Sequence, residues 1–209
     1  MGMSLGAVSE NAEAQAFGFN QTPPIDLPGA VKSNFPSVAD LANNAPAQAY
    51  SAFGQQNVTA SALQMALVAA GIANGGVIET PHVMAQIRDS QGNLVTSYTP
   101  KPWLKATSTS TAQQVTSLMQ GVVTNGTAAN VFPASQNVAA KTGTAEVGTQ
   151  AQYTSDWMIA FVPGSHVVVA LVAPFQASDR TGAIISGPPT CAILEAALNP
   201  NSPQACPGG

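Results

Sequence analysis

The most regular hydrophobic pattern in the chain lies between residues 110 and 124. Apolar side chains recur there on one helical face, at the i, i+3, i+4, i+7 and i+8 positions: Val115, Leu118, Met119, Val122 and Val123. Ser110 and Gln113 have the spacing of a capping box, and Gly126 follows the last apolar position. The sequence therefore predicts an amphipathic helix over residues 110–124.

Other segments carry weaker helical signals. Residues 59–74 are apolar almost all round between a capping Thr59 and a glycine stop, which predicts a buried helix. The first twenty residues are typical of the end of an Ala-rich helix, with Gly18 as its stop. A last helix is predicted over residues 189–198, because Pro188 or Pro189 suits a first turn.

After Val138 the apolar period changes to that of strands. Three strands are predicted, over residues 138–147, 155–163 and 166–174. The last two form a hairpin, and the segment 157–162 is apolar on both faces, so we expect it to be central with helices on either side. The predicted fold class is α+β, an antiparallel sheet flanked by helices.

The predicted elements divide the chain into a body and a tail. The body is residues 1–198, and its parts are a helix end with a Pro-rich connection (1–50), a helical part with a hairpin within 83–95 (51–137), and the sheet with the last helix (138–198). Residues 199–209 form a tail that is loose unless Cys206 fastens it. Cys191 and Cys206 lie 15 positions apart, and a disulfide and two idle thiols are equally compatible with that spacing.

Composition excludes several classes of function. Charged residues make up 8% of the 209 residues and the net charge is −4, which argues against binding to nucleic acid or to anionic membranes. The longest apolar runs are too short to cross a bilayer, and the first residues lack the features of a secretory signal. We therefore expect either a cytosolic protein or a piece of a longer one.

One segment carries a chemical interpretation, Lys141-Thr142-Gly143-Thr144. In a strand the two threonine hydroxyls point to one side, and the glycine leaves the backbone open to close approach by a substrate. Lys141 adds a positive charge in a chain with only four lysines. These groups suit an anionic substrate terminus. The alternative is an edge strand with a solvated lysine.

The segments around this motif resemble those of a known family. Residues 141–146 and 156–163 are similar to the third active-site motif and the following strand of penicillin-binding transpeptidases. The segments 53–76 and 81–82 resemble the stretch between that family's second and third motifs, and residues 2–19 resemble the helix after the second motif in class B members. The resemblance implies the C-terminal part of a transpeptidase domain with a β-lactamase-like fold.

The family's first motif is absent from these residues. No serine has a lysine three positions later, so the Ser-x-x-Lys nucleophile is missing. Two segments, 9–11 and 135–137, match the second motif, Ser-x-Asn, by letter but not by place. The resemblance implies that the parent enzyme forms a serine acyl-enzyme and that this chain alone is inactive.

The resemblance also assigns roles to the motif. The N–H of Thr144 would be an oxyanion donor, and Lys141 would favour the anion and assist proton transfer. Thr142, Gly143 and Thr144 would bind the D-Ala-D-Ala terminus of a peptidoglycan stem peptide, or a β-lactam. No metal and no cofactor are implied, and the expected partners are the missing N-terminal half of the domain and, in addition, division or elongation proteins.

Three alternatives for the function stay open. The resemblance favours a membrane-anchored transpeptidase on the extracytoplasmic face of the bacterial membrane. A D,D-carboxypeptidase differs only in its acceptor, and a non-catalytic peptidoglycan or penicillin recognition module would keep the strand but lack the serine. A fragment of any of these would expose an apolar face where its other half belongs.

Other polar and aromatic residues are given structural roles. Trp157 is interpreted as a core residue and Glu146 as solvated. Neither His82 nor His166 has companions that would indicate a metal site or a general base. Asp156 and Asp179 are predicted in turns, and Arg180, between the last strand and the last helix, is given no role in the site.

Overall fold

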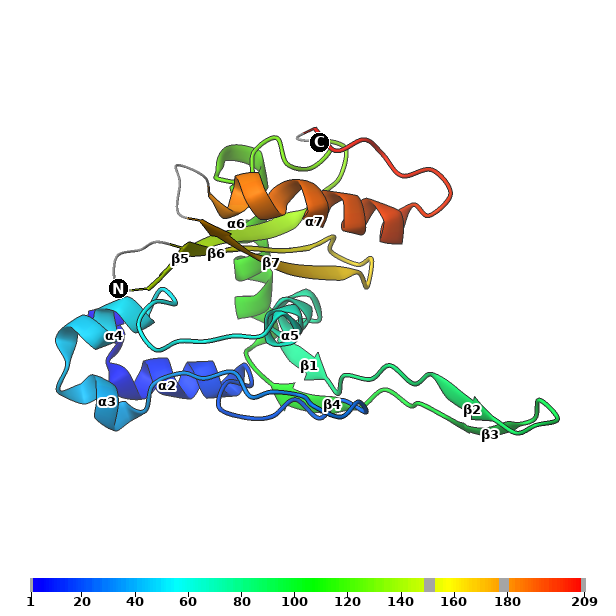
Figure 1. Ribbon diagram of the computed structural model, residues 1–209, viewed down its shortest axis with the longest axis horizontal. Coiled ribbons are helices and arrows are strands. Elements are labelled where there is room, and N and C mark those ends of the chain that lie inside the picture. The colour runs from blue at the N-terminus through cyan, green and yellow to red at the C-terminus, as the bar shows by residue number, and fades with distance from the viewer. Residues whose placement is uncertain (1, 149–152, 177–180, 208–209) are drawn as a thin grey trace.

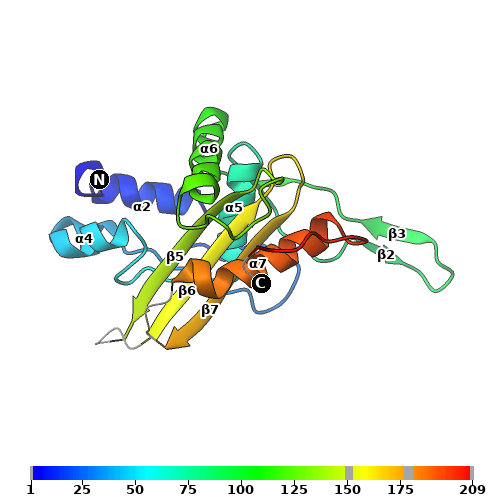
Figure 2. The same cartoon turned by 90° about the horizontal axis from the view of Figure 1, so that it is seen from above.

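A computed structural model describes residues 2–148, 153–176 and 181–207 of the chain. Its centre is a three-stranded antiparallel sheet in the order β5-β6-β7, formed by Ala139–Val147, Tyr153–Phe161 and Val168–Gln176. Helix α7 (Gly182–Leu198) covers one face, and α5 (Ala62–Ala73) with α6 (Thr109–Asn125) covers the other, as Figures 1 and 2 show. The predicted central strand between two helical layers is confirmed.

Successive side chains of the strands point to opposite faces of the sheet, and they contribute to two hydrophobic clusters, one on each face. Ala140 and Met158 pack with Leu194 of α7, whereas Ala139 and Phe161 pack with Met119 of α6. Residues at even positions of β5 therefore face α7, and residues at odd positions face α5 and α6.

The N-terminal segment forms a separate group of short helices below the sheet in Figure 1. These are α1 (Gly2–Leu5), α2 (Ala7–Ala16), α3 (Val38–Ala42) and α4 (Ala45–Ser51). Gly18 follows α2 at φ 90°, as its predicted role as a stop requires. The Pro-rich connection contains two helices that were not predicted, because each is shorter than two turns and starts at a local side-chain cap, Ser37 or Asn44.

Four short strands lie between α5 and α6. Strand β1 (Val77–Glu79) pairs with β4 (Pro102–Lys105), and β2 (Gln86–Arg88) pairs with β3 (Leu94–Ser97). The second pair is the predicted hairpin, which projects from the body as an arm in Figures 1 and 2. The first pair was not predicted, because three or four residues are too few to establish a period.

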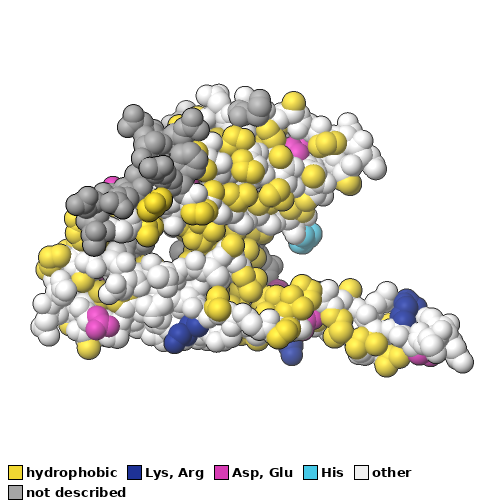
Figure 3. All heavy atoms as spheres, viewed as in Figure 1, with side chains coloured by type: hydrophobic (Ala, Val, Ile, Leu, Met, Phe, Trp, Pro, Cys, Tyr) yellow, Lys and Arg dark blue, Asp and Glu magenta, His cyan; other side chains and the backbone are white. Residues whose placement is uncertain are grey.

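The arm is held at its base and at its tip by aspartates. Asp26 accepts hydrogen bonds from the backbone N–H groups of Val83 and Met84, which hold the pKa of its carboxyl below the usual value. In the turn, the side chain and then the backbone N–H of Asn93 lower the pKa of Asp89 in the same way. Large apolar side chains along the arm are exposed, and Figure 3 shows them beside the body.

The helix starts differ from the predicted ones. The N-caps are Ser61 for α5 and Ser108 for α6, rather than Thr59 and Ser110. Helix α7 begins at Gly182 and runs through Pro188 and Pro189, although each proline removes an intrahelical donor. Burial of its Ser186, Thr190, Cys191 and Leu194 against the sheet keeps this segment helical.

Within the described ranges, every helix is too short or too polar to cross a membrane.

Candidate active-site strand

The Lys-Thr-Gly segment lies in β5, which has a neighbour on one side only. The strand order leaves the other side of β5 without a strand among the described residues. Lys141 and Thr144 are exposed, and Thr142 and Gly143 are partly exposed. The segment is therefore an accessible edge strand, neither coiled nor buried in the core.

The motif presents different chemistry on the two faces of the sheet. Lys141 is at an odd position, so its side chain starts on the face of α5 and α6, and its ammonium group donates to the carbonyl oxygen of Thr142. Thr142 and Thr144 lie on the α7 face. The predicted arrangement, with both hydroxyls on one side and the glycine between them, is present in the strand.

The first turn of α7 packs directly on the motif. The backbone N–H of Gly182 donates to Thr144 Oγ1 at 2.9 Å, and this bond leaves the hydroxyl proton of Thr144 free. A Cβ atom at Gly182 would lie 2.2 Å from the carbonyl oxygen of Gly143 and 2.7 Å from that of Trp157. Only glycine allows this approach of helix to sheet.

Replacing Gly182 by alanine is therefore expected to destabilise the protein by about 1–3 kcal/mol, the usual cost of overpacking. The first turn of α7 must move, and the bond to Thr144 weakens with it. Gly121→Ala is the matched control, because that glycine lies in α6 with open space around it. Thermal denaturation of both variants measures the difference, and equal melting temperatures would contradict the packing argument.

Thr142 also has a partner. Its Oγ1 lies 2.7 Å from Oγ1 of Thr127, in the loop that leads from α6 to β5. Thr127 and the first turn of α7 line a cavity of about 420 Å³, together with Val131, Thr181 and Ile184 among others. This cavity therefore lies beside Thr127, the contact of Thr142, although residues 141–144 do not line it.

Two sequence interpretations beside the motif are wrong. Asp156 lies in β6 opposite Thr144, is fully buried and accepts a hydrogen bond from Thr154 Oγ1 at 2.8 Å, so it is not a turn residue. Helix α7 covers this position, and Ser186 of that helix donates to the backbone carbonyl of Asp156. Trp157, interpreted as core, is only half-buried and pairs with Gly143. Glu146 is exposed, as predicted.

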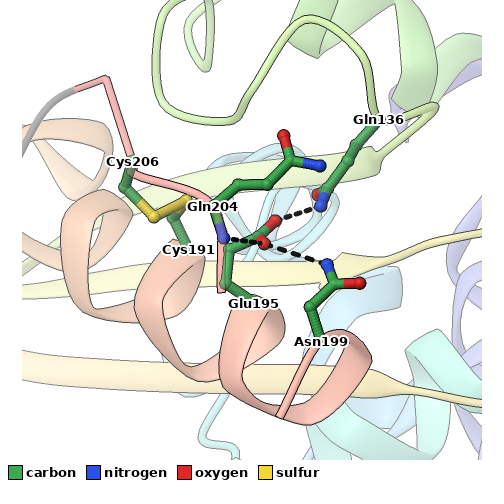
Figure 4. Close-up of a disulfide and its surroundings, with 6 residues drawn as sticks. All are labelled: Gln136, Cys191, Glu195, Asn199, Gln204 and Cys206. Carbon is green, nitrogen blue, oxygen red and sulfur yellow. Dashed lines mark hydrogen bonds between the residues drawn. A yellow bond between two sulfur atoms is a disulfide. The ribbon is translucent and has the colours of Figure 1, made fainter. Parts of the chain in front are cut away.

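A buried carboxylate joins α7 to two distant segments, as Figure 4 shows. Glu195 is 1% exposed, and it accepts hydrogen bonds from the Gln136 amide, the Asn199 amide and the Gln204 backbone N–H. One helical turn earlier, Cys191 forms a disulfide with Cys206. The tail is therefore fastened, and of the two compatible interpretations of the cysteines the disulfide is the one present.

The site residues that sequence reasoning missed are Thr127, Gly182 and Glu195. All three come from segments interpreted as loop or as an ordinary helix. The bonds that join them to distant segments, to Thr142, Thr144 and Gln136 respectively, span 15 to 59 positions in the chain. Asp179 and Arg180 lie outside the described residues. Where the structure describes the chain, His, Cys, Asp and Glu form no group of three that could hold a metal ion.

Comparison with known proteins decides the family. Residues 3–195 match the model of the penicillin-binding protein transpeptidase domain. The chain belongs to the transpeptidase-domain family of penicillin-binding proteins. A curated relative, peptidoglycan D,D-transpeptidase PbpA of Mycolicibacterium smegmatis, is 34% identical in an alignment of 213 positions that covers 97% of this chain and 41% of the relative.

Solved structures of penicillin-binding proteins agree with this membership. The crystal structure of PBPA from Mycobacterium tuberculosis matches with a TM-score of 0.82 and 27% identity, over 95% of this chain and 45% of that one. The imipenem acyl-enzyme complex of the same protein matches with a TM-score of 0.79 and 28% identity, over 95% and 43%. The resemblance and the α+β fold are therefore confirmed. The chain spans about two fifths of the length of the curated PbpA relatives it matches.

Proposed function

We propose that this chain is the part of a peptidoglycan D,D-transpeptidase that supplies the Lys-Thr-Gly strand, with the acylated serine on sequence outside residues 1–209. The observation that carries the proposal is the placement of residues 141–144 in an accessible edge strand. The missing Ser-x-x-Lys motif and the partial coverage of the PbpA relatives support a nucleophile located elsewhere.

The threonines supply the grip on the substrate terminus. Thr142 and Thr144 present their hydroxyls on the same side of β5, and Thr144 accepts the N–H of Gly182 with its oxygen. Its own proton therefore remains available for an acceptor such as a carboxylate. In this role the two hydroxyls bind the terminal carboxylate of a D-Ala-D-Ala stem peptide, or that of a β-lactam.

The backbone at Thr144 supplies an oxyanion donor. In an antiparallel ladder, alternate residues of an edge strand direct both backbone groups to the partner strand, and the residues between direct theirs outward. The Thr142 carbonyl accepts the ammonium of Lys141, which is consistent with the outward set. Thr144, two positions on, belongs to the same set, so its N–H is available for the oxygen that becomes negative during acyl transfer.

Lys141 supplies positive charge at the open edge of β5, where its ammonium donates to the Thr142 carbonyl. There it attracts the anionic substrate and assists proton transfer to the leaving amine. With the serine attacking and the oxyanion held by backbone N–H groups, acyl transfer proceeds through a covalent enzyme intermediate. The role of this chain in that reaction is binding and charge stabilisation.

We further propose that the protein works on the extracytoplasmic face of the bacterial membrane. The Cys191–Cys206 disulfide supports this location, because disulfides persist in oxidising compartments and are rare in the cytosol. Peptidoglycan lies outside the cytoplasmic membrane, so an enzyme that cross-links it must work there as well.

Labelling with a fluorescent penicillin tests the proposal. The purified 209-residue chain is expected to carry no label after denaturing electrophoresis, because it holds no Ser-x-x-Lys serine. A protein that includes the upstream coding sequence is expected to be labelled at a serine of that motif. Label that stays on the 209-residue chain would refute the assignment of the nucleophile.

Penicillin labelling, followed by an assay with a stem-peptide thioester, separates the alternative functions. An upstream sequence without Ser-x-x-Lys, giving a protein that binds penicillin reversibly but is never labelled, would identify a recognition module. For a labelled protein, the products from a stem-peptide thioester distinguish the acceptors. Transfer to an amine identifies the transpeptidase, and hydrolysis alone identifies a D,D-carboxypeptidase.

A further inference from the structure

Thr127 is the side chain that contacts the hydroxyl of Thr142. The two Oγ1 atoms lie 2.7 Å apart, and either can be the donor. Thr127 belongs to the loop after α6, fourteen positions before Lys141, and it is outside the Lys-Thr-Gly motif. Its hydroxyl therefore acts on the motif from a separate segment.

The direction of this hydrogen bond matters when an anion binds. A carboxylate accepts but does not donate, so Thr142 must direct its proton at the substrate. The contact between the threonines can then persist only with Thr127 as donor and Thr142 as acceptor. A hydroxyl that accepts one bond is polarised to donate a stronger second one, so Thr127 improves Thr142 as a donor.

The loop holds Thr127 in place on both sides. The backbone N–H groups of Gly126 and Ala128, which flank Thr127, both donate to the carbonyl of Val122 near the end of α6, and Ala128 is fully buried. Val131 is buried in the cluster beneath α7, and farther along the loop Gln136 donates to Glu195. The side chain of Thr127 is exposed, but its backbone is fixed, so it can hold the hydroxyl of Thr142 in one orientation.

We propose that Thr127 is a positioning residue for the binding of the substrate carboxylate, acting through Thr142; this inference rests on the proposed function. It makes no contact with the reacting atoms. Thr127 selects the hydroxyl orientation of Thr142 that donates to the anion.

The test uses the protein that includes the upstream sequence and measures acylation by benzylpenicillin at a series of concentrations. This separates the dissociation constant of the initial complex from the limiting acylation rate. Thr127→Val is expected to weaken the initial complex by up to about tenfold, the upper end of what one hydrogen bond between neutral groups contributes. The limiting rate is expected to change less than about threefold, since the oxyanion donors are untouched.

Three comparisons keep the result specific. Thr127→Ser retains the hydroxyl and is expected to restore binding. Thr124→Val, at an exposed threonine of α6 whose hydroxyl contacts the carbonyl of Gly121 and the side-chain amide of Asn125, is expected to leave binding unchanged. In a Thr142→Val background, Thr127→Val is expected to have no further effect, because the group through which it acts is gone.

Four outcomes would overturn the inference. They are wild-type binding by Thr127→Val, an undiminished effect in the Thr142→Val background, no rescue by serine, and a fall in melting temperature that accounts for the lost affinity. If the unsubstituted protein is not acylated, the proposed function is wrong and this inference falls with it. If that protein is acylated and Thr127→Val matches it, only this inference is wrong.

Discussion

Replacing Lys141 by methionine in the protein that includes the upstream sequence is expected to lower the second-order rate constant for penicillin acylation about 10²- to 10⁴-fold. That range is typical of the loss of a group that assists proton transfer. Methionine keeps most of the aliphatic stem and removes the ammonium, so packing along β5 changes little. Both the attraction of the anionic ligand and the proton transfer at the open edge of β5 are lost.

The matched control for this experiment is Lys105→Met. Lys105 is also an exposed lysine in a strand, but it ends β4, away from the sheet that carries the motif. Its replacement removes the same charge from the same chain, so it reports the effect of net charge alone. Acylation kinetics that fall equally in both variants would show that Lys141 acts through long-range charge and has no role in the site.

The sheet was predictable from sequence because its pattern is local. Residues 157–162 are apolar on both faces, and this predicts a central strand between helical layers without any knowledge of contacts. The spacing of hydroxyls in the motif likewise follows from the two-residue period of any strand. For these features, the two-residue period of the strand decides which face of the sheet each side chain occupies.

The surroundings of the motif were not predictable, because they depend on contacts between distant segments. Pro188 and Pro189 indicate a helix start near residue 189, and the packing of Gly182 against the sheet places that start seven residues earlier. Asp156 has turn chemistry by type, but it is buried in β6, where Ser186 of α7 donates to its backbone carbonyl. Both errors lie where α7 packs on the sheet, and that packing joins residues that are far apart in the sequence.

The hydrogen-bonded partners of the site were hidden for the same reason. Thr127 is one threonine among many in a Thr-rich segment, and its sequence carries no sign that it meets Thr142. Glu195 has the appearance of a surface residue of a helix, and it is buried because the tail and the loop before β5 both bring donors to it. The roles of such residues become visible only in the folded structure, where their contacts with distant segments are formed.

Loss of the disulfide is the second large effect that we expect. Cys206→Ser opens a link with a sequence separation of 15, and closing a loop of that size is worth about 3 kcal/mol in chain entropy. Cys206 is the suitable position because it is only partly buried, whereas a serine at Cys191 would place a hydroxyl in the core. Denaturant unfolding of the protein with and without the substitution measures the difference in free energy.

The buried carboxylate of Glu195 adds to the effect of the disulfide. When the tail is released, the carboxylate loses the N–H of Gln204 and keeps the amides of Gln136 and Asn199, so a buried charge becomes less well satisfied. A reducing agent is expected to lower the stability of the unsubstituted protein to that of Cys206→Ser and to leave the variant unchanged. A variant as stable as the oxidised protein would mean that the contacts of Glu195 alone hold the tail, and that the covalent link contributes nothing to the folded state.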